Sequence, residues 1–93
     1  MRLMTIGMVA TMAAAILGMD VSIAHAQSCF DLWVQRNSIY KRAGYCFKTT
    51  PAIRHFGNAG CMYDNEAELP LTPGERARIA GIVRMERRFG CSQ

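Results

Sequence analysis

Four cysteines, Cys29, Cys46, Cys61 and Cys91, constrain the fold of this chain more than any other feature, because they are even in number and the chain is short. In a short exported protein such a set predicts disulfides, here two. A zinc site would need close pairs such as Cys-x-x-Cys, whereas successive cysteines here are 17, 15 and 30 positions apart. We therefore expect two structural bridges and no metal.

The first 26 residues have the features of a secretory signal peptide. Arg2 gives a short positive start, an uncharged apolar run extends from Leu3 to Met19, and Ala24-His25-Ala26 places small residues before a cleavage point at Gln27. The alternative is an uncleaved membrane anchor, since a run of about 17 residues is at the short limit for spanning a bilayer. The pattern favours cleavage, a periplasmic or secreted protein, and no membrane span after the leader is removed.

Cleavage would leave residues 27–93 as one domain of 67 residues. Without Arg2 and Asp20 it carries ten Lys and Arg against six Asp and Glu, a net charge of +4. A chain of this length buries only about 60% of the surface that it exposes when unfolded. Cross-links are therefore needed to stabilise it, in agreement with the cysteine count.

Hydrophobic periodicity predicts helices at both ends of this domain. From Ser28 to Ala43, apolar residues recur at three- and four-residue steps, and Gly44 is a natural stop. The middle segment is rich in turn residues. It contains a short helix expected from Ala52 to Phe56, with Thr50 as its cap, and an acidic loop expected from Asp64 to Leu71.

The last helix begins at a capping box, in which Thr72 and Glu75 satisfy each other's backbone amides. Ile79, Ile82 and Val83 form its apolar face, and Gly90 ends it. The expected fold is a small, mostly α, disulfide-stabilised domain. It has two longer antiparallel helices, a turn-rich middle segment and a short helix.

Catalytic chemistry is hard to assemble from this composition. His55 is the one histidine after the leader, so no metal site or catalytic pair can form around it from a second histidine. Asp64, Glu66 and Glu68 lie on an expected loop, where a fixed separation between carboxylates is hard to maintain. We expect neither an enzyme nor a bound cofactor.

The excess of basic residues points to anionic partners, because net positive charge attracts anionic polymers. In an exported protein these are cell-wall, lipopolysaccharide or phospholipid surfaces rather than nucleic acid. The expected contacts are Lys41, Arg42, Arg84, Arg87 and Arg88. The alternative is that these side chains only solvate the outer faces.

Two charged residues interrupt the apolar stripes. Arg36 lies in the stripe of the first predicted helix, and Glu86 lies in that of the last. Buried charges are normally paired, so we expect these two to pair with each other. Asn37 and Tyr40 lie beside Arg36 and could complete a hydrogen-bonded cluster.

Four cysteines allow three connectivities, among which the sequence does not choose. If the long helices pack antiparallel, Cys29 lies beside Cys91, and Cys46 is left to join Cys61. Arg36 is then seven residues from Cys29, and Glu86 is five residues from Cys91. The two side chains are therefore offset by about 3 Å along the helix axis. The alternative, Cys29–Cys46 with Cys61–Cys91, requires the chain to fold back on each helix separately.

The same region resembles the core motif of the YARHG domain, named for Tyr-Ala-Arg-His-Gly. The matching positions are Arg36, Asn37, Ile39, Tyr40, Arg42, Gly44, Tyr45 and Phe47, followed by Ile53, Phe56, Asn58, Tyr63, Glu75 and Glu86. The likeness covers about residues 29–90. Lys41 and Ala43 depart from the Ala and His of the name motif, and the four cysteines are not general to the family.

The resemblance implies an extracytoplasmic bacterial domain associated with the cell envelope, without an established biochemical role. Two hypotheses follow. The first is a non-enzymatic binding or interaction module of the envelope, whose partner is an anionic polymer or a periplasmic protein. The second is a secreted inhibitor-like or structural protein that binds another protein through a basic face.

Overall fold

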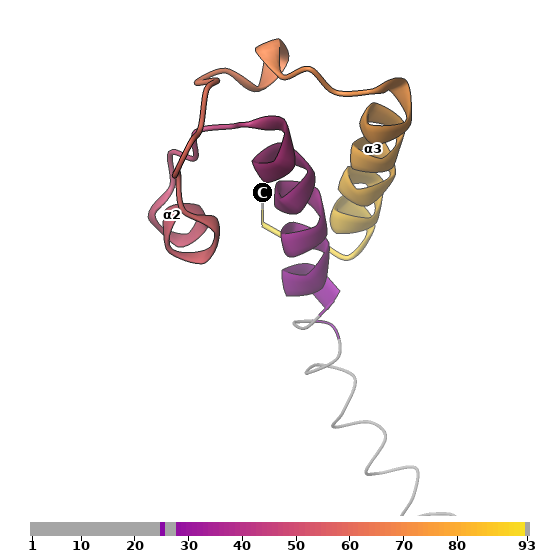
Figure 1. Ribbon diagram of the computed structural model, residues 1–93. Helices are drawn as coiled ribbons and strands as arrows, with labels where there is room; N and C mark the ends of the chain where they lie inside the picture. Colours follow the sequence, from indigo (N-terminus) through magenta and orange to yellow (C-terminus); the bar gives the residue numbers. More distant parts are fainter. Residues whose placement is uncertain (1–24, 26–27, 93) are drawn as a thin grey trace, which may run out of the picture.

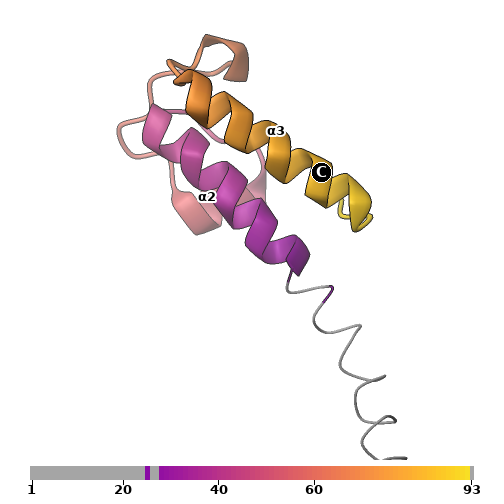
Figure 2. The same cartoon turned by 90° about the vertical axis from the view of Figure 1, so that its right-hand side faces the viewer.

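The computed structural model describes residue 25 and residues 28–92, so the predicted leader, apart from His25, lies outside the described residues. Residues 28–43 are helical and are called the first helix below. They are followed by the short helix α2 (Thr50–Phe56), the 3-10 turn η1 (Glu66–Glu68) and the helix α3 (Pro73–Arg88). The first helix and α3 run antiparallel side by side, with α2 on the other side of the first helix (Figures 1 and 2). This architecture confirms the predicted mostly α, disulfide-stabilised fold.

Both long helices end in the same backbone motif. Gly44 has a φ of 96°, and the Tyr45 amide donates to the Tyr40 carbonyl at 3.1 Å. At the end of α3, Gly90 has a φ of 69°, and the Cys91 amide donates to the Glu86 carbonyl at 2.8 Å. A glycine with positive φ followed by a six-to-one hydrogen bond is the Schellman motif. Each helix thus ends at the glycine that the sequence predicts.

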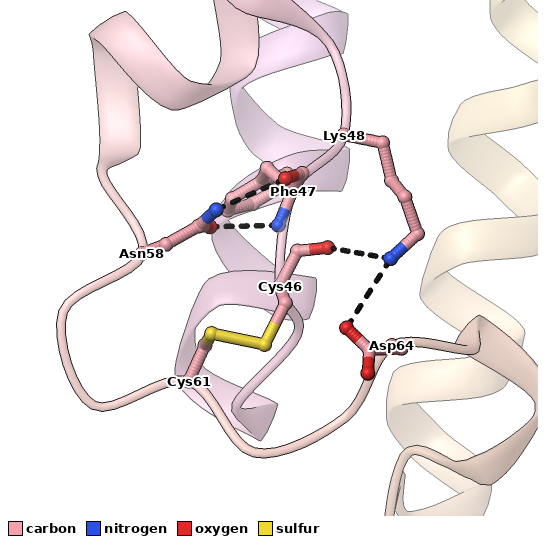
Figure 3. Close-up of polar contacts among 6 residues, drawn as sticks. All are labelled: Cys46, Phe47, Lys48, Asn58, Cys61 and Asp64. Atoms are coloured by element: carbon pink, nitrogen blue, oxygen red, sulfur yellow. Dashed lines mark hydrogen bonds and ion pairs between the residues drawn. A yellow bond between two sulfur atoms is a disulfide. The ribbon is translucent and has the colours of Figure 1, made fainter.

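The middle segment is held by side-chain contacts as much as by its short helix. Asn58 accepts from the Phe47 amide at 2.7 Å and donates to the Phe47 carbonyl at 3.0 Å (Figure 3). The Cys46 amide donates to the Tyr63 carbonyl at 2.8 Å, and Cys46 is bonded to Cys61. The two sides of the segment are therefore joined covalently and by hydrogen bonds.

Two local predictions for the middle segment were wrong in detail. The cap of α2 is Thr49, whose hydroxyl accepts from the Ala52 amide, and Thr50 is already helical. The expected acidic loop contains η1, which begins because the Asn65 side chain accepts from the Ala67 amide at 3.0 Å. The first difference arises because two adjacent threonines can each accept the same orphan amide, and the second because the Asn65 side chain caps a turn within the acidic segment.

The core has two parts, one on each side of the first helix. Towards the middle segment, the buried side chains are Tyr40, Phe47, Ala52 and Leu69. Towards α3 they are Leu32, Ile39 and Ile82. Leu71 and Ile79 pack against both parts. The first helix is therefore the element on which the rest of the domain is assembled.

Candidate functional site

The four cysteines form two disulfides. Cys29 is bonded to Cys91 with a Cα–Cα distance of 5.6 Å, and Cys46 is bonded to Cys61 with a Cα–Cα distance of 5.1 Å. The first bridge joins the start of the first helix to the end of α3. Of the connectivities left open by the sequence, this is the one that an antiparallel helix pair requires.

The charges in the two apolar stripes meet in the same register. Arg36 donates from Nε to Glu86 Oε1 at 2.7 Å and from Nη2 to Oε2 at 3.1 Å. The Glu86 side chain is fully buried and that of Arg36 is 14% exposed. The hydrogen bond to Glu86 raises the pKa of Arg36 above its ordinary value, although burial acts in the opposite direction. Such a two-point pair compensates charges that would be costly to bury alone.

The two residues expected to complete this cluster have different positions. Asn37 is buried, but its Nδ2 donates to the Trp33 carbonyl one turn earlier, at 2.9 Å, and not to the ion pair. Tyr40 is buried beside the pair. Burial, followed by the charge of Glu66, raises the pKa of Tyr40, and the charge of Arg36 opposes this shift. The cluster is therefore an ion pair with Tyr40 beside it, and Asn37 stabilises its own helix.

The basic residues named from the sequence are divided between structural and exposed positions. Lys41 Nζ donates to the Gly57 carbonyl at 3.0 Å and so satisfies the end of α2. Arg42 is exposed near Glu75, whose pKa it helps to lower. Arg87 is exposed in the last turn of α3. None of these three residues is among the lining of the hollow that Arg84 and Arg88 border.

Arg84 and Arg88 line a shallow groove along α3, together with Arg78, which the sequence reasoning missed. The groove has a volume of about 490 Å³ and is called the arginine groove below. Its lining residues are Gln35, Arg78, Gly81, Ile82, Arg84, Met85 and Arg88. The signal that could have found Arg78 is helical spacing, since positions 78, 81, 85 and 88 share one face at three- and four-residue steps.

The arginine groove has the properties of an anion-binding surface. Arg78, Arg84 and Arg88 are exposed, and none forms an ion pair with another residue of the described part of the chain. From position 78 to position 88, α3 advances about 15 Å, so the three guanidinium groups can reach successive anionic groups of a polymer. Gly81 has no side chain to fill the middle of the groove, and Met85, 46% exposed, adds an apolar contact.

No comparable chemistry gathers around His55. Its exposed ring lies 4.5 Å from that of Phe56 and 5.6 Å from that of Trp33, both edge-on. Within residue 25 and residues 28–92, no group of three or more His, Cys, Asp or Glu side chains could hold a metal ion. The arginine groove is therefore the candidate functional site.

A search for membrane-crossing helices among the described residues finds none with the necessary length and apolar character. Comparison with curated proteins and with solved structures returns no match. Comparison with protein families returns one domain, described as the YARHG domain, which matches residues 11–87. This match covers well over half of the 93-residue chain and includes both halves of the ion pair. The chain belongs to the YARHG domain family.

Proposed function

We propose that this protein is a non-enzymatic binding module of the bacterial envelope, located in the periplasm or secreted, and that it holds an anionic envelope polymer in the arginine groove. The observation that carries the proposal is the set of three exposed guanidinium groups without an ion-pair partner among the described residues. Guanidinium groups bind phosphate and carboxylate groups in a two-point geometry.

An extracytoplasmic location supports an anionic envelope polymer as the partner. The YARHG domain is an extracytoplasmic type of module, and two disulfides are typical of an oxidising compartment. The anionic polymers of that compartment are lipopolysaccharide and the cell wall, so a cationic groove in an exported domain faces such partners rather than nucleic acid. The groove is also shallow and open, so a long polymer can lie along it without having to insert an end.

The test is binding to purified lipopolysaccharide and purified peptidoglycan by co-sedimentation. We expect the oxidised protein to bind at least one of them and to be released as salt is raised, because exposed charges are screened. The double variant Arg84→Gln/Arg88→Gln should lose this binding. The control Arg54→Gln/Arg87→Gln removes the same charge from exposed positions outside the groove and should retain it.

Two results would contradict the proposal. An equal loss of binding in both double variants would show attraction by net charge alone. If the protein bound neither lipopolysaccharide nor peptidoglycan, an anionic envelope polymer would be excluded as its ligand. The second hypothesis, a protein partner bound through the basic face, is favoured by the half-exposed Met85 among the arginines. A stoichiometric periplasmic protein, recovered by wild type and lost with Met85→Gln, would support that hypothesis instead.

A further inference from the structure

A second hollow is lined by residues from the end of the first helix, η1 and the first turns of α3. This is the end of α3 far from its disulfide (Figure 1). The volume of the hollow is about 360 Å³, at the lower end of the range for small-molecule sites, about 300–1,000 Å³. We call it the charged hollow. No residue lines both the charged hollow and the arginine groove, so the two are separate sites.

The charged hollow contains one acid and one base that do not meet. Glu66, from η1, and Arg76, from the first turns of α3, both line it. Neither forms an ion pair with the other or with another residue in the described part of the chain. Arg76 Nη2 donates to the Leu69 carbonyl at 3.3 Å, which restrains its guanidinium group. The hollow is therefore lined by a carboxylate and a guanidinium group that are not paired with each other, and both can contact a ligand there.

The rest of the lining is apolar, apart from one phenol. Leu71 and Ile79 are half-buried and form part of the wall, and Tyr40, 8% exposed, also lines the hollow. Burial and the charge of Glu66 raise the pKa of Tyr40, so its hydroxyl keeps its proton at neutral pH and can donate a hydrogen bond. An apolar wall with a few converging polar groups is the usual composition of a small-ligand site.

We infer that the charged hollow binds a small aliphatic zwitterion of the α-amino-acid type, with its ammonium group at Glu66, its carboxylate at Arg76 and its side chain against Leu71 and Ile79. Each charge of such a ligand finds an opposite charge that has no ion-pair partner among the described residues. A ligand with only one of the two charges would pair with only one of these two residues. This site is independent of the proposed function, because it uses none of the groove residues.

The experiment compares three probes that share the leucine side chain and differ at the two charged groups. Binding of leucine, leucinamide and N-acetyl-leucine to the oxidised protein is followed by chemical-shift titration. We expect leucine to bind at least tenfold more tightly than leucinamide, which lacks the carboxylate, or N-acetyl-leucine, which lacks the ammonium group. Equal affinity for all three probes, or no binding of leucine at millimolar concentration, would overturn the inference.

Variants assign each charge to its residue. Glu66→Gln should weaken leucine binding and abolish the preference over N-acetyl-leucine, and Arg76→Gln should abolish the preference over leucinamide. Glu68→Gln and Arg87→Gln are the controls, because these exposed residues carry the same charges outside the hollow. All four side chains are exposed, so the variants should fold. Equal weakening by the controls would show a general charge effect and overturn the assignment.

Discussion

Arg36 and Glu86, fifty residues apart in the chain, form a two-point ion pair across the interface of the two long helices. The disulfide between Cys29 and Cys91 joins these helices at one end. The ion pair therefore lies about two helical turns from the disulfide, and the same antiparallel register allows both the disulfide and the ion pair to form. A shift by one turn, about 5.4 Å, would leave the fully buried Glu86 carboxylate without its partner. The pair therefore favours this register over a shifted one.

The first prediction concerns this ion pair. Arg36→Met and Glu86→Leu should each lower the free energy of unfolding by about 3–5 kcal/mol, because each leaves a buried charge uncompensated. The double variant should lose less than the sum. Urea unfolding of the oxidised proteins measures all four free energies, and Glu86→Gln provides a milder variant. Additive losses would show that the two side chains do not interact.

A second prediction concerns the disulfides. Peptide mapping without reduction should recover Cys29 linked to Cys91 and Cys46 linked to Cys61. The two disulfides close loops with sequence separations of 62 and 15 residues. From the loop-entropy relation, replacing Cys29 and Cys91 by alanine should lower the free energy of unfolding by about 4 kcal/mol, and replacing Cys46 and Cys61 should lower it by about 3 kcal/mol. Thermal unfolding of both double variants would compare these losses. Recovery of a Cys29–Cys46 peptide would contradict the helix packing.

The capping box of α3 leads to a third prediction. Thr72 Oγ1 accepts from the Glu75 amide at 3.1 Å, and Glu75 Oε1 accepts from the Thr72 amide at 2.9 Å. Thr72→Ala should lower the free energy of unfolding by about 1 kcal/mol. Thr72→Ser, which keeps the hydroxyl, should lower it by less. An unchanged denaturant midpoint for Thr72→Ala would show that this cap contributes nothing.

The same capping box predicts a pH dependence. The hydrogen bond from the Thr72 amide is the main cause that lowers the pKa of Glu75 below its ordinary value of 4.5. The ionised carboxylate is therefore favoured in the folded state, and its contribution is present above pH 4.5 and is lost as the pH falls through the lowered pKa. Glu75→Gln should remove this part of the acid destabilisation. Identical pH profiles of wild type and variant, measured by urea midpoints, would contradict it.

The fifth prediction concerns Gly81 in the middle of α3. A Cβ at this position would meet only Arg84 Nη2, at 3.6 Å, which is ordinary contact with the far end of a flexible side chain. Gly81→Ala should therefore raise the free energy of unfolding by about 0.5–1 kcal/mol through helix propensity. Ala77→Gly, at an exposed position of the same helix, should lower it by a similar amount. A loss of stability in Gly81→Ala would show that the groove does not tolerate a methyl group.

Features that depend on neighbours in the chain could be predicted from the sequence. The Thr72 capping box and the ends of the long helices at Gly44 and Gly90 depend on hydrogen bonds over a few residues, and the structure has them as predicted. The cap of α2 was misplaced by one residue because Thr49 and Thr50 both have the hydroxyl that a cap needs. The number of disulfides, but not their pairing, followed from the cysteine count.

Only the tertiary structure decided which distant side chains meet. Lys41 is an ordinary exposed cation in the sequence, but α2 docks beside the first helix and places the Gly57 carbonyl within reach of its Nζ. The helical period places Arg76 and Arg78 on different sides of α3, and packing decides what lies there: η1 at the hollow of Arg76 and Gln35 at the groove of Arg78. Helical period fixes the angle between two side chains of one helix. What each side chain faces depends on how elements far apart in sequence pack, and no local hydrogen bond encodes that packing.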